Sequence, residues 1–142
     1  MKLFLDSSVL LSASASAKGA SRFLVENAES LSWSLISSAY CLAETQKNLT
    51  KLGPAAVANF KRLVRDRIEW VGDALSPDKI LIFPKAKDRP VVLSALAAKV
   101  DVLLTLDRQD FMGLLGSQVY GVAIKTPGDW LLECREKGIM NL

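Results

Sequence analysis

The stretch DRPVVLSALAAKVDVLLTLDRQDF, residues 88–111, decides the fold class that this sequence predicts. Its first part predicts a helix, because a proline is tolerated in a first turn and apolar residues then recur at helical spacing over residues 91–98. The continuous apolar run Val102–Leu104 is typical of a strand covered on both faces. This unit places Asp88 at a helix start and Asp107 beyond the carboxyl end of a strand. In open α/β sheets, ligands bind at that edge.

The rest of the chain repeats this alternation of strands and helices. Further strands are expected at Leu3–Leu5, Trp33–Ile36, Ile68–Val71 and Val119–Ile124, whereas Ile80–Phe83 is ambiguous between a strand and a helix end. Helices are expected over residues 16–29 and 54–67, and a turn or short helix is expected from Val9. Two further helices are expected to begin at side-chain caps: one runs from Ser37 or Ser38 to residue 52, and the other follows Thr126. The pattern predicts an α/β fold, a three-layer α/β/α domain with a central parallel sheet, in a single domain over residues 1–142.

Composition excludes several classes of chemistry. Histidine is absent, which rules out a Ser-His-Asp or Cys-His mechanism and a histidine-ligated zinc site. A bound metal would therefore have mainly oxygen ligands, which favours Mg²⁺ or Mn²⁺. The net charge of +3 is too small to indicate nucleic-acid binding by itself. Cys41 and Cys134 form no disulfide framework and suit buried or free thiols in a reducing compartment.

The N-terminal apolar segment predicts a strand rather than a secretion signal. Asp6 and the two serines after it divide the segment into Leu3–Leu5 and Val9–Leu11, and both runs are shorter than a signal core of about 7–15 apolar residues. No run elsewhere is long enough to cross a membrane. We therefore expect a cytoplasmic protein without a membrane partner.

Four acidic residues are expected to meet at one edge of the sheet. Asp6 and Asp107 each follow a predicted strand, Glu44 lies on a helix among apolar and small neighbours, and Asp88 begins a helix. Carboxylates that converge repel one another unless a divalent cation neutralises them, and such a cation could orient a phosphodiester and activate water. Each acid also has a structural explanation as a cap, a turn residue or, for Glu44, a partner of Lys47 or Asn48. Spacing alone leaves both interpretations open.

Four segments carry a resemblance to a known family. They are LFLDSSVLLSA (residues 3–13), SSAYCLAET (37–45), KDRPVVLSALAAKVDVLLTLDRQDF (87–111) and KTPGDWL (125–131). Together they resemble the PIN-domain family and, within it, the VapC-like toxin ribonucleases of prokaryotes. The chain departs from the family pattern at Leu106, where a small or polar residue is common, and at Ser7-Ser8, where Thr-Asn or Ser-Val is commoner. These departures bear on substrate positioning.

The resemblance implies a metal-dependent endoribonuclease that cleaves single-stranded or structured RNA, forms a homodimer and is blocked by an antitoxin. It assigns the ligands of Mg²⁺ or Mn²⁺ to Asp6, Glu44, Asp88 and Asp107, with Asp110 as a further candidate. The hydroxyls of Ser7 and Thr105 would support these ligands. The basic residues near the acids could contact the phosphates of the RNA; they are Lys85, Lys87, Arg89 and Arg108. An ordinary solvated charged surface would explain the presence of these residues equally well.

Three alternatives remain open at this point. The first is a PIN nuclease of RNA processing outside toxin–antitoxin systems. The second is a PIN-like module that binds RNA or protein without cleaving. The third is a phosphohydrolase with Asp6 as its nucleophile, which the sequence disfavours because Ser8 stands where such enzymes carry a second aspartate.

Overall fold

The computed structural model describes residues 1–73, 89–107 and 118–140. The strands in these ranges are β1 (Lys2–Leu5), β2 (Ser34–Ser38), β3 (Glu69–Val71), β4 (Val102–Leu104), β5 (Gln118–Val119) and β6 (Val122–Lys125). They form one sheet in the order β3-β2-β1-β4-β6-β5. All neighbours pair in parallel except β5, which runs antiparallel to β6 at the edge. The predicted α/β fold with a central parallel sheet is confirmed.

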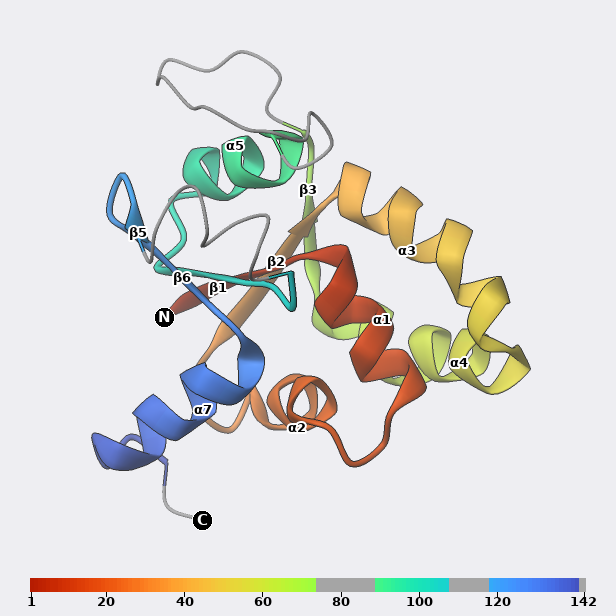
Figure 1. The fold of residues 1–142 in the computed structure, drawn as a ribbon, viewed down its shortest axis with the longest axis horizontal. Coiled ribbons are helices and arrows are strands. Elements are labelled where there is room, and N and C mark those ends of the chain that lie inside the picture. The colour runs from red at the N-terminus through yellow and green to blue at the C-terminus, as the bar shows by residue number, and fades with distance from the viewer. Residues whose placement is uncertain (74–88, 108–117, 141–142) are drawn as a thin grey trace.

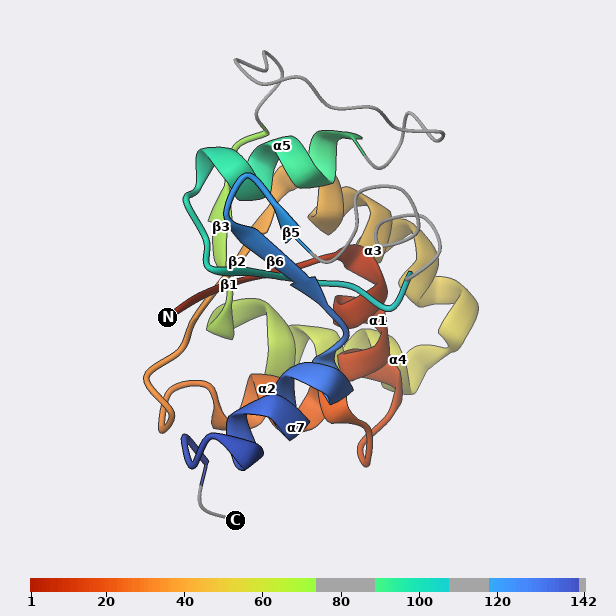
Figure 2. The ribbon, with the colours of Figure 1, turned by 60° about the vertical axis from the view of Figure 1, so that its left-hand side comes forward.

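Helices cover both faces of the sheet. They are α1 (Ser7–Ala15), α2 (Ala20–Asn27), α3 (Ala39–Leu52), α4 (Pro54–Asn59), α5 (Arg89–Ala97) and α7 (Pro127–Glu136), with a π-helical turn η1 (Phe60–Val64) and a 3₁₀ turn η2 (Arg65–Arg67) after α4. Figures 1 and 2 show α5 on one face and α2 and α7 on the other. Helix α3 contacts both α1 and α5 and so lies beside both layers.

The central strand β1 is buried on both of its faces. Leu3, Phe4 and Leu5 are all 0% exposed, since β2 and β4 flank the strand and helices cover both of its faces. A strand in this position needs apolar residues on both sides, so its sequence is a continuous apolar run rather than an alternating one. None of the helices in the described ranges has the length and apolar composition that a membrane span requires.

Side-chain caps mark where the strands give way to helices. Asp6 caps α1 by accepting from the Ser7 N–H, Ser38 caps α3 by accepting from the Cys41 N–H, and Thr126 caps α7 by accepting from the Asp129 N–H. The predicted caps at Ser38 and Thr126 are confirmed. Because β1, β2 and β6 are parallel, all three caps lie at the carboxyl edge of the sheet.

Arg22 holds the end of α1 in place. The side chain is 6% exposed and its guanidinium donates to the carbonyl oxygens of Ala13 and, at 3.2 Å, Ser14. Its charge is paired with Glu26 at 3.6 Å. These carbonyls are among the last of α1 and have no partner within the helix, so the arginine supplies donors that the helix lacks.

Two helix predictions were wrong in extent. Residues 54–67 were expected to form one helix, but α4 ends at Asn59 and the chain continues as the wider η1 and the tighter η2. Residues 16–29 were expected to be helical, whereas α2 spans only Ala20–Asn27. Apolar spacing cannot distinguish α, π and 3₁₀ turns over so few residues.

The last predicted strand is in fact a hairpin. Residues 119–124 were expected to form one strand interrupted by Gly121, and the interruption is a turn at Tyr120 and Gly121, with φ of 46° and 85°, between β5 and β6. Positive φ at both central residues is what a two-residue hairpin turn needs, and glycine adopts it without strain. The ambiguous segment Ile80–Phe83 lies outside the described residues.

Candidate active site

Asp6 lies at the centre of the carboxyl edge, between the end of β1 and the start of α1. Its side chain is 6% exposed. Oδ1 accepts from the Ser7 N–H at 2.8 Å, and Oδ2 accepts from the hydroxyls of Ser8 at 3.0 Å and Thr105 at 2.9 Å. The backbone N–H of Asp6 donates to the Leu104 carbonyl at 3.0 Å, which fixes β1 beside β4 at this point.

The environment of Asp6 disfavours an isolated negative charge. Burial raises the pKa of Asp6 above its usual range, the hydrogen bonds from Thr105, Ser8 and Ser7 oppose that rise, and the charge of Glu44 adds to it. A buried carboxylate with a second carboxylate nearby is costly without a compensating cation. The site therefore has the electrostatic character expected of a place where positive charge binds.

Glu44 approaches Asp6 from α3, 37 residues after Ser7 in the sequence. Ser7 bridges the two acids, because its N–H donates to Asp6 and its hydroxyl donates to Glu44 Oε2 at 2.9 Å. Tyr40, one turn earlier on α3, donates its hydroxyl to Glu44 Oε1 at 3.3 Å. The alternative, in which Glu44 pairs with Lys47 or Asn48 on a solvated face, does not describe its carboxylate, since the Asn48 amide donates to the Glu44 backbone carbonyl at 2.8 Å. Both carboxylate oxygens face hydroxyl groups.

Thr105 and Asp107 follow β4 at the same edge. Thr105 is fully buried, and its hydroxyl accepts from the Asp107 N–H at 3.1 Å while donating to Asp6. Asp107 is half-buried. The backbone of Asp107 is therefore linked to Asp6 through a single hydroxyl. Ser7 and Thr105, predicted to support the acids, both contact them directly.

The remaining predicted residues are placed only in part. Arg89 is exposed at the first position of α5. Asp88, Asp110, Lys85, Lys87 and Arg108 lie outside the described residues. In the part of the chain that is described, no three acidic or sulfur ligands gather closely enough to hold a metal ion. Asp6 and Glu44 are the pair that the structure brings together, and Asp107 does not complete a trio with them.

The donors around this pair fit a hard divalent cation. They are carboxylate and hydroxyl oxygens, the ligands that Mg²⁺ and Mn²⁺ prefer, and no described sulfur donor belongs to a metal-binding group. Each carboxylate is also oriented by hydrogen bonds from neighbouring side chains, as ligands of metals usually are. Asp6 and Glu44 are therefore the described residues that could hold such an ion.

Two residues of this network were not singled out by the sequence analysis. Tyr40 contacts Glu44, and its spacing of four residues on the same helix was a signal that could have identified it. Ser8 contacts Asp6, but in the sequence it stood out as a departure from the family pattern and as the residue in place of a second aspartate, not as a partner of Asp6. The second partner of Ser8 is the backbone N–H of Leu106, which follows β4 and lies 98 residues away in sequence. Local spacing could not predict this contact.

Cys41 is a buried thiol close to Asp6 and is not one of the candidate ligands. Burial raises the pKa of the Cys41 thiol to about 11, and the charge of Asp6 acts in the same direction. Burial also raises the pKa of Cys134. Both thiols are free and buried, as expected from the sequence.

We expect a thiol reagent such as Ellman's reagent to modify neither cysteine of the native protein at pH 8. At that pH a thiol with a pKa of about 11 is thiolate to only roughly one part in a thousand, and only the thiolate reacts. The control is the protein unfolded in guanidinium, in which both of its two cysteines should react. Rapid labelling of the native protein would show that one thiol is accessible and would contradict this description.

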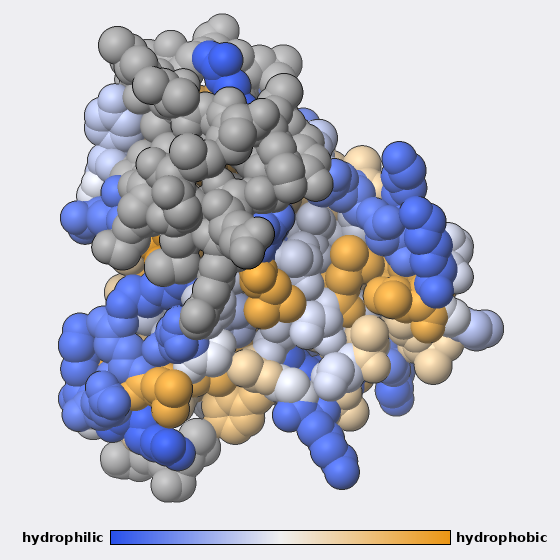
Figure 3. Space-filling view, in the orientation of Figure 1, coloured by the Kyte–Doolittle hydropathy of each residue, from blue (hydrophilic) through white to orange (hydrophobic). Residues whose placement is uncertain are grey.

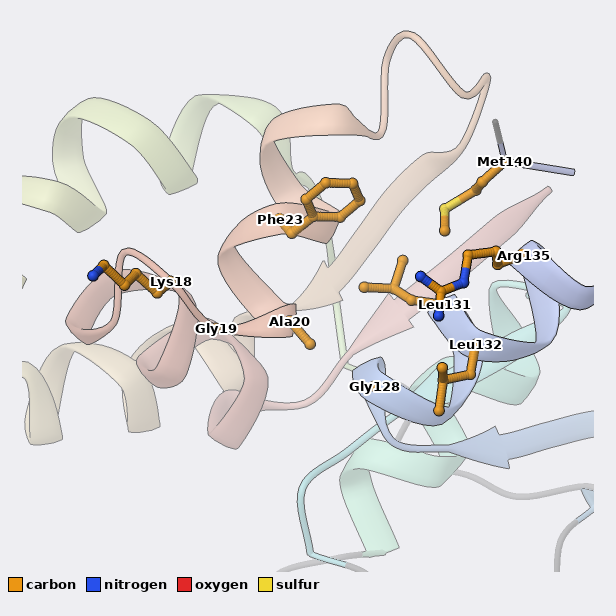
Figure 4. Close-up of a pocket in the computed structure, with 9 residues that line it drawn as sticks. All are labelled: Lys18, Gly19, Ala20, Phe23, Gly128, Leu131, Leu132, Arg135 and Met140. Atoms are coloured by element: carbon orange, nitrogen blue, oxygen red, sulfur yellow. The ribbon is translucent and has the colours of Figure 1, made fainter. Parts of the chain in front are cut away.

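Two hollows of the surface are distinct from the acidic pair. One, of about 380 Å³, lies between α1 and α3 and is lined by Leu11, Ser12, Ala15, Asn48, Lys51 and Leu52. Figure 3 shows apolar surface over these helices, bordered by hydrophilic surface. The other, of about 290 Å³, lies between α2 and α7, where Phe23 and Leu131 face each other (Figure 4). Neither of these two hollows is lined by a candidate ligand.

Comparisons with known proteins agree with the fold and the predicted family. The structure is similar to a chain in the crystal structure of VapBC2 from Rickettsia felis bound to a DNA fragment from their promoter, with a TM-score of 0.60 and 16% sequence identity. The match covers 89% of this chain and 98% of that one. No curated protein matches the sequence. The family model of the PIN domain matches residues 2–109, which include two of the four segments that carry the resemblance in full and a third, residues 87–111, up to residue 109. The chain therefore belongs to the PIN-domain family.

Proposed function

We propose that this protein is a Mg²⁺- or Mn²⁺-dependent endoribonuclease that hydrolyses phosphodiester bonds of RNA. PIN domains are nucleases, and membership of the family supports hydrolytic activity in general. The observation that carries the proposal is the pair of Asp6 and Glu44. Two acids from different elements meet at the carboxyl edge of the sheet and are joined through Ser7. Capping of α1 accounts for Asp6 but not for a second acid held beside it.

In this proposal Asp6 and Glu44 hold the ion together with Asp88 and with Asp107 or Asp110. When bound, a divalent cation would supply charge neutralisation for the phosphodiester and a lowered pKa for a coordinated water. The chain's own residues orient the acids. Ser7 and Tyr40 donate to Glu44, while Ser8 and Thr105 donate to Asp6. Phosphates of the RNA would meet Lys85, Lys87, Arg89 and Arg108.

The proposal extends to the biological role of a toxin that an antitoxin blocks and that forms a homodimer. The sequence resemblance to VapC-like toxins supports it, and so does the likeness of the fold to a chain of the VapBC2 structure. A small protein encoded beside this one should co-purify with it and suppress its cleavage of RNA. Light scattering of the purified chain would test for the homodimer.

Cleavage of a labelled RNA by the purified protein tests the activity. We expect cleavage with Mg²⁺ or Mn²⁺, none in EDTA, and a loss on the order of 10²–10³-fold in Glu44→Gln, which is typical when one preorganised electrostatic group is removed. The matched control is Glu29→Gln, an exposed glutamate outside the site, which should cleave at the normal rate. Cleavage that persists in EDTA would contradict the role of the metal.

A non-cleaving binding module is the second candidate. The sequence leaves this alternative open, and the described ranges bring two acids together, Asp6 and Glu44, through Ser7. Calorimetric titration with Mn²⁺ separates the two functions. A protein that neither cleaves nor binds the ion would be a binding module, whereas one that binds the ion without cleaving would indicate that the RNA supplied is not its substrate.

A further inference from the structure

Ser8 makes two hydrogen bonds that join remote parts of the chain. Its hydroxyl donates to Asp6 Oδ2 at 3.0 Å and accepts from the backbone N–H of Leu106 at 3.1 Å, 98 residues away in sequence. The side chain is half-buried at the second position of α1. One hydroxyl thus connects the acid at the start of α1 with the segment that follows β4.

Thr105 does the same for the next amide. Its hydroxyl donates to Asp6 Oδ2 at 2.9 Å and accepts from the Asp107 N–H at 3.1 Å. Two consecutive amides, of Leu106 and Asp107, therefore reach the same carboxylate oxygen, each through one hydroxyl. Hydrogen bonds in such chains polarise and strengthen one another. The links through Ser8 and Thr105 therefore both hold the segment after β4 against Asp6.

The bonds of Ser8 differ from those of other hydroxyls in these helices. Ser14 donates to the Leu10 carbonyl at 2.8 Å and Thr45 to the Cys41 carbonyl at 2.7 Å, the usual bond of a helical hydroxyl to its own helix. Capping of α1 does not require Ser8 either, because Asp6 Oδ1 already accepts from the Ser7 N–H. The bond to Leu106 therefore acts on the segment after β4 rather than on α1.

That segment gains little from apolar burial at Leu106. The Leu106 side chain is 46% exposed, so packing contributes little to its position, and the hydrogen bonds to hydroxyls become the more important restraint. The next residue is Asp107, a candidate ligand. A displacement at Leu106 would therefore move Asp107 relative to Asp6.

We propose that Ser8 is a positioning residue that holds the segment after β4, and with it Asp107, against Asp6. The role rests on the proposed nuclease, because the arrangement it maintains is that of the divalent-cation site. Ser8 itself does not need to touch the ion or the RNA. Residues that orient the ligands of a metal typically change its affinity by about 10–100-fold when they are lost.

The test compares Ser8→Ala, Ser8→Cys and Ser8→Thr with the wild type. Mn²⁺ affinity is measured by calorimetry, kcat and KM are measured on a labelled RNA, and exchange of the Leu106 amide is measured by NMR. We expect Ser8→Ala to weaken Mn²⁺ binding at least about tenfold, to lower kcat more than it changes KM, and to speed amide exchange at Leu106. Ser8→Thr keeps the hydroxyl and should restore all three. Ser8→Cys keeps the volume with weaker hydrogen bonds and should fall between them, which also covers the case in which Ser8→Ala fails to fold.

Ser14→Ala is the matched control, since it removes a hydroxyl from the same helix that bonds only within that helix. Its Mn²⁺ affinity and kcat should equal those of the wild type even if its stability falls. A wild type that binds Mn²⁺ and cleaves, with Ser8→Ala unchanged in both respects, would overturn the positioning role alone. A wild type that does neither would overturn the proposed nuclease and the positioning role with it.

Discussion

Asp6→Asn should abolish metal-dependent RNA cleavage and leave the fold intact. The substitution keeps the shape of the side chain and the acceptor for the Ser7 N–H but replaces a charged ligand with a neutral amide. We expect kcat to fall on the order of 10²–10³-fold or more, about 3–4 kcal/mol of transition-state stabilisation. Mn²⁺ binding measured by calorimetry should weaken in parallel.

The stability of Asp6→Asn should move in the opposite direction to its activity. Burial raises the pKa of Asp6 and the charge of Glu44 adds to that rise, so a neutral residue removes a penalty that outweighs the hydrogen bonds lost from Ser8 and Thr105. In EDTA, the free energy of unfolding should be equal to that of the wild type within about 1 kcal/mol, or higher. Urea titration of both proteins measures this difference.

Asp66→Asn is the control for Asp6→Asn, because it makes the same change at an exposed residue of η2. It should leave cleavage and metal affinity unchanged. If Asp6→Asn cleaved RNA at the wild-type rate, Asp6 would be a helix cap alone. If it lost several kcal/mol of stability instead, the carboxylate would be structural and its loss of activity would not be informative.

Arg22→Met should cause the largest loss of stability among the predicted variants. The guanidinium supplies donors to the Ala13 and Ser14 carbonyls at the end of α1, and methionine fills a similar volume without a donor. Loss of two charged hydrogen bonds should cost about 2–4 kcal/mol, because the Ser14 carbonyl keeps the Asn59 amide as a donor but the Ala13 carbonyl loses the arginine. For a chain of this size that lowers Tm by roughly 10 °C.

Thermal unfolding followed by circular dichroism measures the Arg22 effect. Arg135→Met, an exposed arginine of α7, is the matched control and should change the free energy of unfolding by no more than about 0.5 kcal/mol. A loss below about 1 kcal/mol in Arg22→Met would mean that other donors replace the arginine. The neighbouring amide of Asn59, which donates to the Ser14 carbonyl at 3.0 Å, would then be the first candidate.

The parallel sheet could be predicted from sequence because the signal is local. Leu3–Leu5 and Val102–Leu104 are short apolar runs that end in polar residues, and strands buried on both faces need that composition. The caps at Ser38 and Thr126 could be predicted for the same reason. The hairpin at Tyr120 and the π-helical turn η1 could not, because each depends on backbone geometry that apolar spacing does not encode.

The candidate site could be predicted only as a set of acids. Asp6 and Glu44 were expected to meet, and they do. Asp6 lies where β1 leads into α1, and Glu44 lies on α3, the helix that follows the neighbouring strand β2. The hydroxyl contacts that orient them depend on how distant segments are aligned. Phe4 pairs with Leu103 in the sheet, and only this register brings Ser8 beside Leu106.

The central place of β1 has a consequence for biosynthesis. Strand β1 leaves the ribosome before the other described strands, yet one of its two neighbours in the sheet is β4, and Thr105 lies 99 residues after Asp6. At about 5–20 residues per second, the emerging chain waits roughly 5–20 s before these partners exist. Pairing over such a separation also makes folding slow. Asp107 is therefore kept apart from Asp6 until most of the chain has been synthesised.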